Sequence, residues 1–149
     1  MPTPPGPPAR RPIGMTLDRV AKEASRAFDD ALVAAGGSRP IWLVLLALTI
    51  DAEANQRQLA DFVGIRGATL THHLNAMEAA GLVTRVRGET NRRSHVVTRT
   101  PAGEELFLRL RAAATAFDER LRTGFSDEEV DALSGLLGRL AVNVRAARD

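Results

Sequence analysis

The sequence predicts a mainly α-helical protein with a single small β-hairpin between its fourth and fifth helices. Three observations support this fold class. Apolar residues recur at helical spacing over most of the chain after residue 15, and capping residues and glycines divide that pattern into six segments. Only between residues 82 and 99 does the period change to the alternation of strands. With 149 residues, 44% of them hydrophobic, the chain is long enough to bury one core.

The first 14 residues differ in composition from the rest of the chain. They hold six of the eight prolines, and because proline lacks an N–H and fixes its own φ, we predict a disordered proline-rich tail over residues 1–14. This segment has two arginines but no apolar stretch after them, so it does not have the pattern of a secretory signal. The longest apolar run, residues 41–50, is about half the length that spans a bilayer. We therefore expect a cytoplasmic protein without a membrane partner.

The first two helices are predicted between this tail and residue 50. Apolar residues keep helical spacing from Thr16, an expected N-cap, to Ala35, and two glycines then end the helix. Its long alanine-rich stripe is expected to pack on the chain's own core or on a partner subunit. Ser38 and Pro40 begin a second helix that is apolar on every side as far as Leu48. A helix of that composition belongs at the centre of the fold.

The third and fourth helices are short and separated by a tight turn. Asn55 and Gln58 form a capping-box pattern before a helix that is expected to bury Leu59, Phe62 and Val63. Gly64 ends that helix. The next begins near Gly67, has Leu70, Leu74 and Met77 on its inner face and stops at Gly81. Two helices joined in this way indicate a helix-turn-helix.

The last three elements follow the helix-turn-helix. Residues 82–87 and 94–99 mix β-branched and polar residues as strands do, and residues 88–93 form the loop between them. A fifth helix starts at Thr100 and Pro101, as cap and first residue. A sixth starts at the capping box from Ser126 to Glu129, and its apolar stripe consists of Val130, Leu133, Leu136, Leu137, Leu140 and Val144.

The fourth helix has the pattern of a recognition helix. Such a helix buries one face and presents small or polar groups on the other, near the N-terminus that meets the major groove. Hydroxyl, imidazole and amide groups can each bond base edges or phosphate oxygens. The alternative is an ordinary solvated face, and the turn before the helix and the hairpin after it favour DNA. The candidate DNA-binding residues of this segment are Arg66, Ala68, Thr69, Thr71, His72 and Asn75.

The hairpin is the second candidate DNA-binding element. The formal charge of the chain is only +2, but residues 56–100 hold seven arginines against three acidic residues. Arg92 and Arg93 lie at the predicted hairpin tip, where an arginine can enter the narrow minor groove. The strand residues Arg85, Arg87 and Arg99 can neutralise phosphates beside it.

Several classes of chemistry lack their residues in this sequence. Without cysteine there is no thiolate nucleophile, disulfide or cysteine-based zinc site. His72 and His73 are adjacent on a helix, so they point about 100° apart and cannot easily bind one ion together. No glycine-rich phosphate loop and no nucleophile paired with a base is visible. We expect no enzyme activity, no cofactor and no metal.

Taken together, these motifs resemble the MarR family of bacterial winged helix-turn-helix transcriptional regulators. No single piece is diagnostic, but their order is specific, and the resemblance covers roughly residues 16–147. The matching segments are Leu59-Ala60, Val63-Gly64-Ile65, Thr69-Leu70-Thr71, the run from Met77 to Val83, Asn91-Arg92-Arg93 and the run from Thr98 to Gly103.

The resemblance implies a homodimer that reads a pseudo-palindromic operator in double-stranded DNA. It implies a winged helix domain over residues 15–149, with a DNA-binding lobe at about 38–100 and dimerisation helices at 15–37 and 101–149. In the family the fourth helix enters the major groove, here with Thr69, Thr71 and His72, and a wing arginine enters the minor groove, here Arg93 with Arg92 beside it. Two departures are Asn91, where an aspartate usually braces that arginine, and Arg66-Gly67, where a serine cap is common.

The resemblance also implies an effector. Many members bind small aromatic acids or phenols between the dimer helices and the DNA lobe, which weakens DNA binding. Phe28, Trp42 and Leu46 are the candidate ligand-binding residues, with packing in the core as the alternative for each. The expected function is therefore a repressor released by a small molecule. The alternative is a dimeric architectural or interaction protein without a specific operator.

Overall fold

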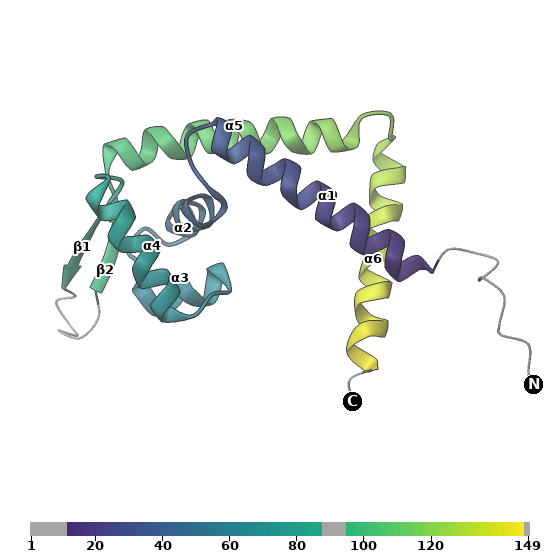
Figure 1. The fold of residues 1–149 in the computed structure, drawn as a ribbon, viewed down its shortest axis with the longest axis horizontal. Coiled ribbons are helices and arrows are strands. Elements are labelled where there is room, and N and C mark those ends of the chain that lie inside the picture. Colours follow the sequence, from purple (N-terminus) through teal and green to yellow (C-terminus); the bar gives the residue numbers. More distant parts are fainter. Residues whose placement is uncertain (1–11, 88–94, 148–149) are drawn as a thin grey trace, which may run out of the picture. The chain divides into compact units, whose positions relative to one another are not determined.

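The computed structural model describes residues 12–87 and 95–147, and within them it confirms the mainly α-helical fold with one hairpin (Figure 1). Residues up to Ala114 form one compact unit, and Thr115–Asp149 form a second. The predicted tail over residues 1–14 lies outside the described residues as far as residue 11. The elements are α1 (Ile13–Ala34), α2 (Arg39–Ile50), α3 (Gln56–Val63), α4 (Gly67–Ala79), β1 (Val83–Arg87), β2 (His95–Arg99), α5 (Pro101–Arg122) and α6 (Asp127–Ala146).

The predicted caps of α2, α3 and α6 are confirmed. The Ser38 hydroxyl accepts a hydrogen bond from the Ile41 N–H at 3.4 Å. Asn55 and Gln58 form a reciprocal box, with bonds of 2.9 and 2.8 Å. Ser126 and Glu129 form another, with bonds of 3.2 and 2.9 Å. Each box satisfies two N–H groups that would otherwise lack a partner at the helix end.

The start of α1 differs from the prediction, because the helix begins at Ile13 rather than after Thr16. Pro12 takes the N-cap position, and its carbonyl accepts hydrogen bonds from the Met15 and Thr16 N–H groups at 3.1 and 3.4 Å. Proline is tolerated at a helix start because the N–H that it lacks would have no helical partner there. Thr16 therefore lies inside the first turn and does not cap the helix.

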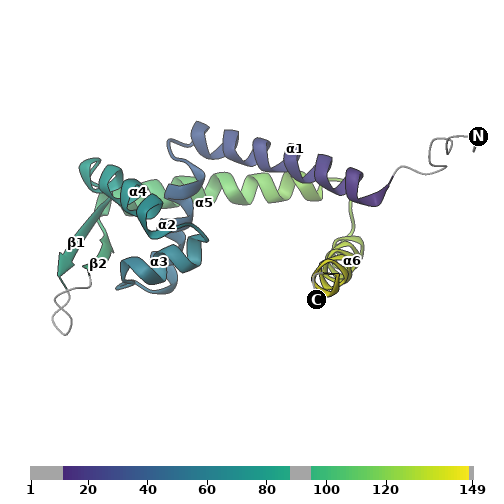
Figure 2. The same ribbon diagram turned by 60° about the horizontal axis from the view of Figure 1, so that its bottom comes forward.

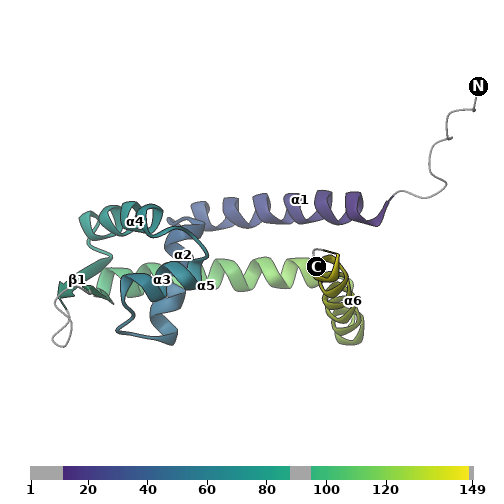
Figure 3. The same cartoon turned by 90° about the horizontal axis from the view of Figure 1, so that it is seen from below.

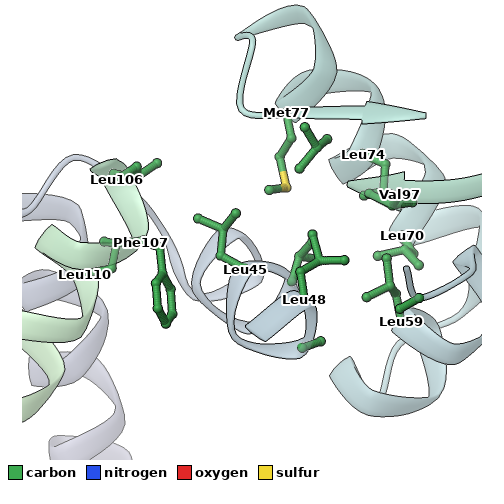
Figure 4. Packing of buried hydrophobic residues seen from close by; sticks show 14 of the residues in the cluster. Leu45, Leu48, Leu59, Leu70, Leu74, Met77, Val97, Leu106, Phe107 and Leu110 are labelled. Atoms are coloured by element: carbon green, nitrogen blue, oxygen red, sulfur yellow. The ribbon is translucent and has the colours of Figure 1, made fainter. Parts of the chain in front are cut away.

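The core of the first unit is centred on α2, as predicted. Val44, Leu45, Ala47 and Leu48 are all buried. Figure 4 shows Leu45 and Leu48 between the leucines of α5 and the buried residues of α3, α4 and β2. These four positions lie on more than one side of the helix, so α2 must be covered on several sides, which explains its near absence of polar residues.

Phe62 contradicts the predicted inner face of α3. The prediction buried Leu59, Phe62 and Val63 together, whereas Phe62 is 46% exposed. In the structure Leu59 is fully buried, and Ala60 and Val63 pack against the core. Residues 59, 60 and 63 form one narrow stripe at helical spacing, and residue 62 lies at its edge. An eight-residue helix needs only that stripe to contact α2 and α4.

The hairpin is antiparallel, with Val83 opposite Arg99 and Arg87 opposite His95. β1 begins at Val83, one residue later than predicted, and Ser94, the predicted first residue of the second strand, lies outside the described residues. The segment before α3 also pairs with β2, through a bridge between Asn55 and Val96 and a 3.1 Å bond from the Val97 N–H to the Ala54 carbonyl. This bridge ties the hairpin to the helix-turn-helix. Figure 3 shows α2, α3 and α4 as one group with β1 at its edge.

A close backbone contact joins the end of α4 to the start of α5. Gly81 has φ +73°, which lets the Leu82 N–H return to the Met77 carbonyl at 2.9 Å. The Leu82 carbonyl accepts from the Thr100 N–H at 3.1 Å, and the Thr100 hydroxyl donates to the Gly81 carbonyl at 2.5 Å. Gly103 lies so close to the Leu82 carbonyl that a Cβ there would overlap it. The C-terminal end of α4 is thus fixed to the first turn of α5 (Figure 2).

In the second unit, α6 is an amphipathic helix with no buried residue among those described. Leu133, Leu136, Leu137 and Val144, all members of the predicted stripe, are exposed. No single helix among the described residues is long and apolar enough to cross a membrane, and α1 and α2 meet that test only as a pair bent by 79°. The proposed division into a DNA-binding lobe and dimerisation helices stays a prediction, because compactness alone does not report function.

Candidate nucleic-acid interface

The outer face of α4 is polar and open to solvent. Leu70, Leu74 and Met77 are fully buried, as predicted, and they fix which side of the helix faces outward. Ala68, Thr69, His72 and Asn75 are all exposed. Because residues three and four apart lie on the same side of a helix, Thr69, His72 and Asn75 form one continuous surface. The structure thus brings together most of the predicted recognition residues.

Thr71 is placed differently from the other predicted residues of α4. It is half-buried, and its hydroxyl donates to the Gly67 carbonyl at 2.9 Å. The same oxygen accepts from the Gln56 side-chain amide at 2.5 Å. Its hydroxyl therefore links the first turns of α3 and α4. This role was not predicted, because it depends on how the two helices pack.

Replacing Thr71 with valine is expected to lower the free energy of unfolding by about 1 kcal/mol, the usual net value of one hydrogen bond. Valine keeps the shape of the side chain but cannot bond Gln56. Urea denaturation measures the change. The matched control is Thr69→Val, on the exposed face of the same helix, which should stay within about 0.5 kcal/mol of the parent protein. Equal losses in the two variants would contradict the linking role of Thr71.

The start of α4 is exposed and basic. Arg66 is the N-cap residue, and no side chain caps the helix, so its first N–H groups and the positive end of its dipole remain available to an anion. A shallow depression of about 570 Å³ beside Arg66 also reaches Arg57 and Gln56 at the start of α3. Sequence reasoning missed Arg57 and Gln56. Their position directly after the Asn55 cap was the available signal.

The three strand arginines do not play the same part. Arg87 is exposed at the end of β1 and has no ion-pair partner among the described residues. Arg85 instead pairs with Glu78 of α4 at 2.6 Å, and Arg99 pairs with Glu104 of α5 at 2.7 Å. The prediction that Arg85 and Arg99 neutralise phosphates is therefore corrected. Both arginines lie on the inward face of the hairpin, and their side chains are only 20% exposed, so each charge requires a partner within the fold.

Arg99 connects three elements of the first unit. Its guanidinium donates to the Leu45 carbonyl at 3.2 Å and to the Thr49 hydroxyl at 2.9 Å, both on α2. It also lies 4.8 Å from the ring centroid of Phe107 on α5. These contacts hold the end of β2 against α2 and α5, and Arg87 remains the strand arginine without an ion-pair partner in the described part of the chain.

Arg92 and Arg93, the predicted minor-groove residues, lie outside the described residues, as does Asn91, where the sequence departs from the MarR pattern.

His72 and His73 lie edge to face, with ring centroids 5.8 Å apart. Among the described residues, no group of three potential ligands could hold a metal ion.

The candidate ligand-binding residues pack against the core. All three are half-buried against the core cluster: Phe28, Trp42 and Leu46. Trp42 stacks on Phe107, with centroids 5.6 Å apart and ring planes 12° apart. The Arg39 guanidinium lies 5.1 Å from the Phe28 centroid. Packing within the fold accounts for these contacts, and a ligand role for the three residues stays a prediction.

Comparison with known proteins finds one family and several solved structures that are similar to this chain. The sequence profile of the MarR family matches residues 38–94, the segment from α2 to the hairpin. The structure of CouR from Rhodococcus jostii RHA1 bound to p-coumaroyl-CoA is similar at 28% identity and a TM-score of 0.71, over 87% of this chain and 91% of that one. Residues 38–94 thus match the MarR family, and the fold of the chain is similar to that of a MarR-family transcriptional regulator from Rhodococcus, at 28% identity and a TM-score of 0.72.

Two further relatives are similar to this chain over most of its length. The repressor CouR bound to a 23-mer DNA duplex is 27% identical, with a TM-score of 0.77, over 87% of this chain and 92% of that one. A transcriptional regulatory protein for the hcr operon of Thauera aromatica is 27% identical over 86% of this chain and 78% of its own length. The winged helix-turn-helix fold is confirmed, and these relatives are transcriptional regulators.

Proposed function

We propose that the protein is a homodimeric, sequence-specific DNA-binding repressor. The observation that carries this proposal is the exposed polar face of α4, between Arg66 at its start and Arg87 at the end of β1. Neither arginine has an ion-pair partner among the described residues, so both are free to meet phosphates. Arg92 and Arg93 would extend this surface into the minor groove. A protein that acts on the chromosome in this way would work in the cytoplasm.

The apolar face of α6 supports a homodimer. Leu133, Leu136 and Leu137 are all exposed, and one helix cannot cover such a stripe by itself. A second copy that covers this face would also present a second α4 to the next half-site. Two-fold symmetry of the protein then requires a pseudo-palindromic operator.

Release by a small aromatic or phenolic ligand is supported by the relatives. CouR is known both with DNA and with p-coumaroyl-CoA. In this chain the ligand would contact Phe28, Trp42 and Leu46, so it would have to compete with the stacking of Trp42 on Phe107. Binding there would stabilise a conformation with lower affinity for the operator.

The proposal predicts operator binding that falls steeply with salt. Fluorescence anisotropy with the DNA upstream of the protein's own gene should give a log-log slope of about −0.9 for each phosphate neutralised. Replacing Arg92 and Arg93 with alanine should weaken binding and reduce the slope by about 0.9 for each arginine that contacts a phosphate. The control is Arg26→Ala with Arg111→Ala, which removes two exposed arginines outside the proposed surface.

A random duplex of the same length tests sequence specificity in the same experiment. A specific repressor should bind its operator at least about 1000-fold more tightly than the random duplex. Equal affinities would contradict the repressor and favour an architectural DNA-binding protein. An unchanged slope in the Arg92 and Arg93 variant would contradict the proposed role of the hairpin tip.

A further inference from the structure

The amide of Asn75 is held in one orientation by the hairpin. Its Oδ1 accepts a hydrogen bond from Nη2 of Arg85 at 2.6 Å. A guanidinium has only donors, so the oxygen of the amide must face it and the NH₂ group must point elsewhere. Asn75 is exposed and lies on the same side of α4 as His72, within the proposed DNA surface.

The position of Arg85 is fixed independently of Asn75, because Arg85 is also bound to Glu78. Its Nε and Nη2 both donate to Oε2 of Glu78, at 3.1 and 2.6 Å, and its side chain is only 20% exposed. The hydrogen bond from Arg85 lowers the pKa of Glu78 below its ordinary value, so this carboxylate stays ionised at neutral pH. In the hairpin register Arg85 lies opposite the buried Val97, which keeps the guanidinium on the α4 side of the strand.

This arrangement limits which base Asn75 can read. The usual contact of asparagine with adenine is bidentate, because the amide oxygen accepts from N6 while the NH₂ donates to N7. In this protein the bond from Arg85 turns the oxygen toward the hairpin, so the NH₂ group is the part of the amide that remains to face a base. Guanine presents two adjacent acceptors, O6 and N7, whereas adenine would leave its N6 donor without a partner.

We propose that Arg85 is a specificity-determining residue that restricts Asn75 to guanine in the major groove. Arg85 acts through Asn75 and does not itself contact the base. The inference rests on the proposed function, because it concerns one base pair of each operator half-site. It goes beyond that function by assigning the chemistry of that base pair.

Selection from a randomised duplex library with the full-length protein tests the inference. The position in the duplex that Asn75 contacts is identified as the one at which the Asn75→Ala variant loses its base preference. The parent protein should favour guanine over adenine there by about fivefold or more, at the lower end of the discrimination that a side chain gives. Arg85→Met frees the amide oxygen, so the preferred base should change to adenine. Arg87→Met is the matched control on the same strand, and it should weaken binding to all sequences without changing the preferred base.

Asn75→Asp provides a second test if Arg85→Met does not fold. Aspartate keeps the bond to Arg85 but has no donor, so the guanine preference should disappear while the urea midpoint of unfolding is retained. Adenine at that position in the parent protein, or a guanine preference that survives Asn75→Asp, would overturn the inference. Failure of the parent protein to enrich any sequence would instead contradict the proposed DNA-binding function.

Discussion

Replacing Gly103 with alanine is expected to lower the free energy of unfolding by about 3 kcal/mol or more, the upper range for overpacking. The new Cβ would overlap the carbonyl oxygen of Leu82 and lie 3.0 Å from Cγ of Arg99. The Leu82 carbonyl cannot move away freely, because it accepts the hydrogen bond from the Thr100 N–H at 3.1 Å. Relief of the overlap therefore requires separation of α5 from the end of α4.

Urea denaturation measures this loss, and Gly67→Ala is its matched control. Like Gly103, Gly67 lies in the first turn of a helix of the first unit, but a Cβ at position 67 would meet no atom within 4 Å. The free energy of unfolding of that variant should stay within about 0.5 kcal/mol of the value for the parent protein. If Gly103→Ala matched Gly67→Ala, the close contact between α4 and α5 would not be a feature of the folded protein.

This contact also affects the proposed DNA surface. The C-terminal end of α4 is held by Gly81 and Leu82 to Thr100, and the hairpin is held to α2 and α5 by Arg99. α4, the proposed recognition helix, and the hairpin are therefore both anchored to the first turn of α5. A rigid support of this kind keeps base-reading groups in the geometry that specificity requires.

The sequence was sufficient to predict the features of the fold that depend on near neighbours. The capping boxes at Asn55 and Ser126 involve residues three apart, so the pattern of residue types already contains the interaction. The exclusion of Phe62 from the core could not be predicted in this way. Residues 62 and 63 are both apolar, and only the packing of α3 on α2 and α4 decides which of them points inward.

The candidate site shows the same division. The exposed face of α4 follows from helical spacing, because the buried leucines determine it. The internal partners of Arg85 and Arg99 depend on strand register and on residues up to 54 positions away. One signal was available, since alternation puts Arg85 on the same face of β1 as the buried Val83. A charged residue on an inward face requires a partner, and Glu78 of the preceding helix provides it.

Replacing Leu133 with glutamate is expected to dissociate the proposed dimer. Leu133 is 49% exposed in the single chain and belongs to the apolar stripe of α6. In a two-fold symmetric interface each substitution occurs twice, and an unpaired buried charge costs about 3 kcal/mol or more. Each factor of ten in a dissociation constant corresponds to roughly 1.4 kcal/mol, so the dimer dissociation constant should rise by at least about 100-fold. Operator affinity should fall with it, because the two half-sites would bind independently.

Sedimentation velocity measures the dissociation, and Val142→Glu is the matched control. Nine residues at 100° each place Val142 on the side of α6 opposite Leu133, and it is similarly exposed at 57%. The two variants therefore carry the same new charge on opposite faces of one helix. A dimeric Leu133→Glu protein would show that this stripe is not the interface, and dissociation by Val142→Glu alone would assign the interface to the opposite face. If both variants and the parent protein were monomers, the paired reading of two half-sites would be excluded.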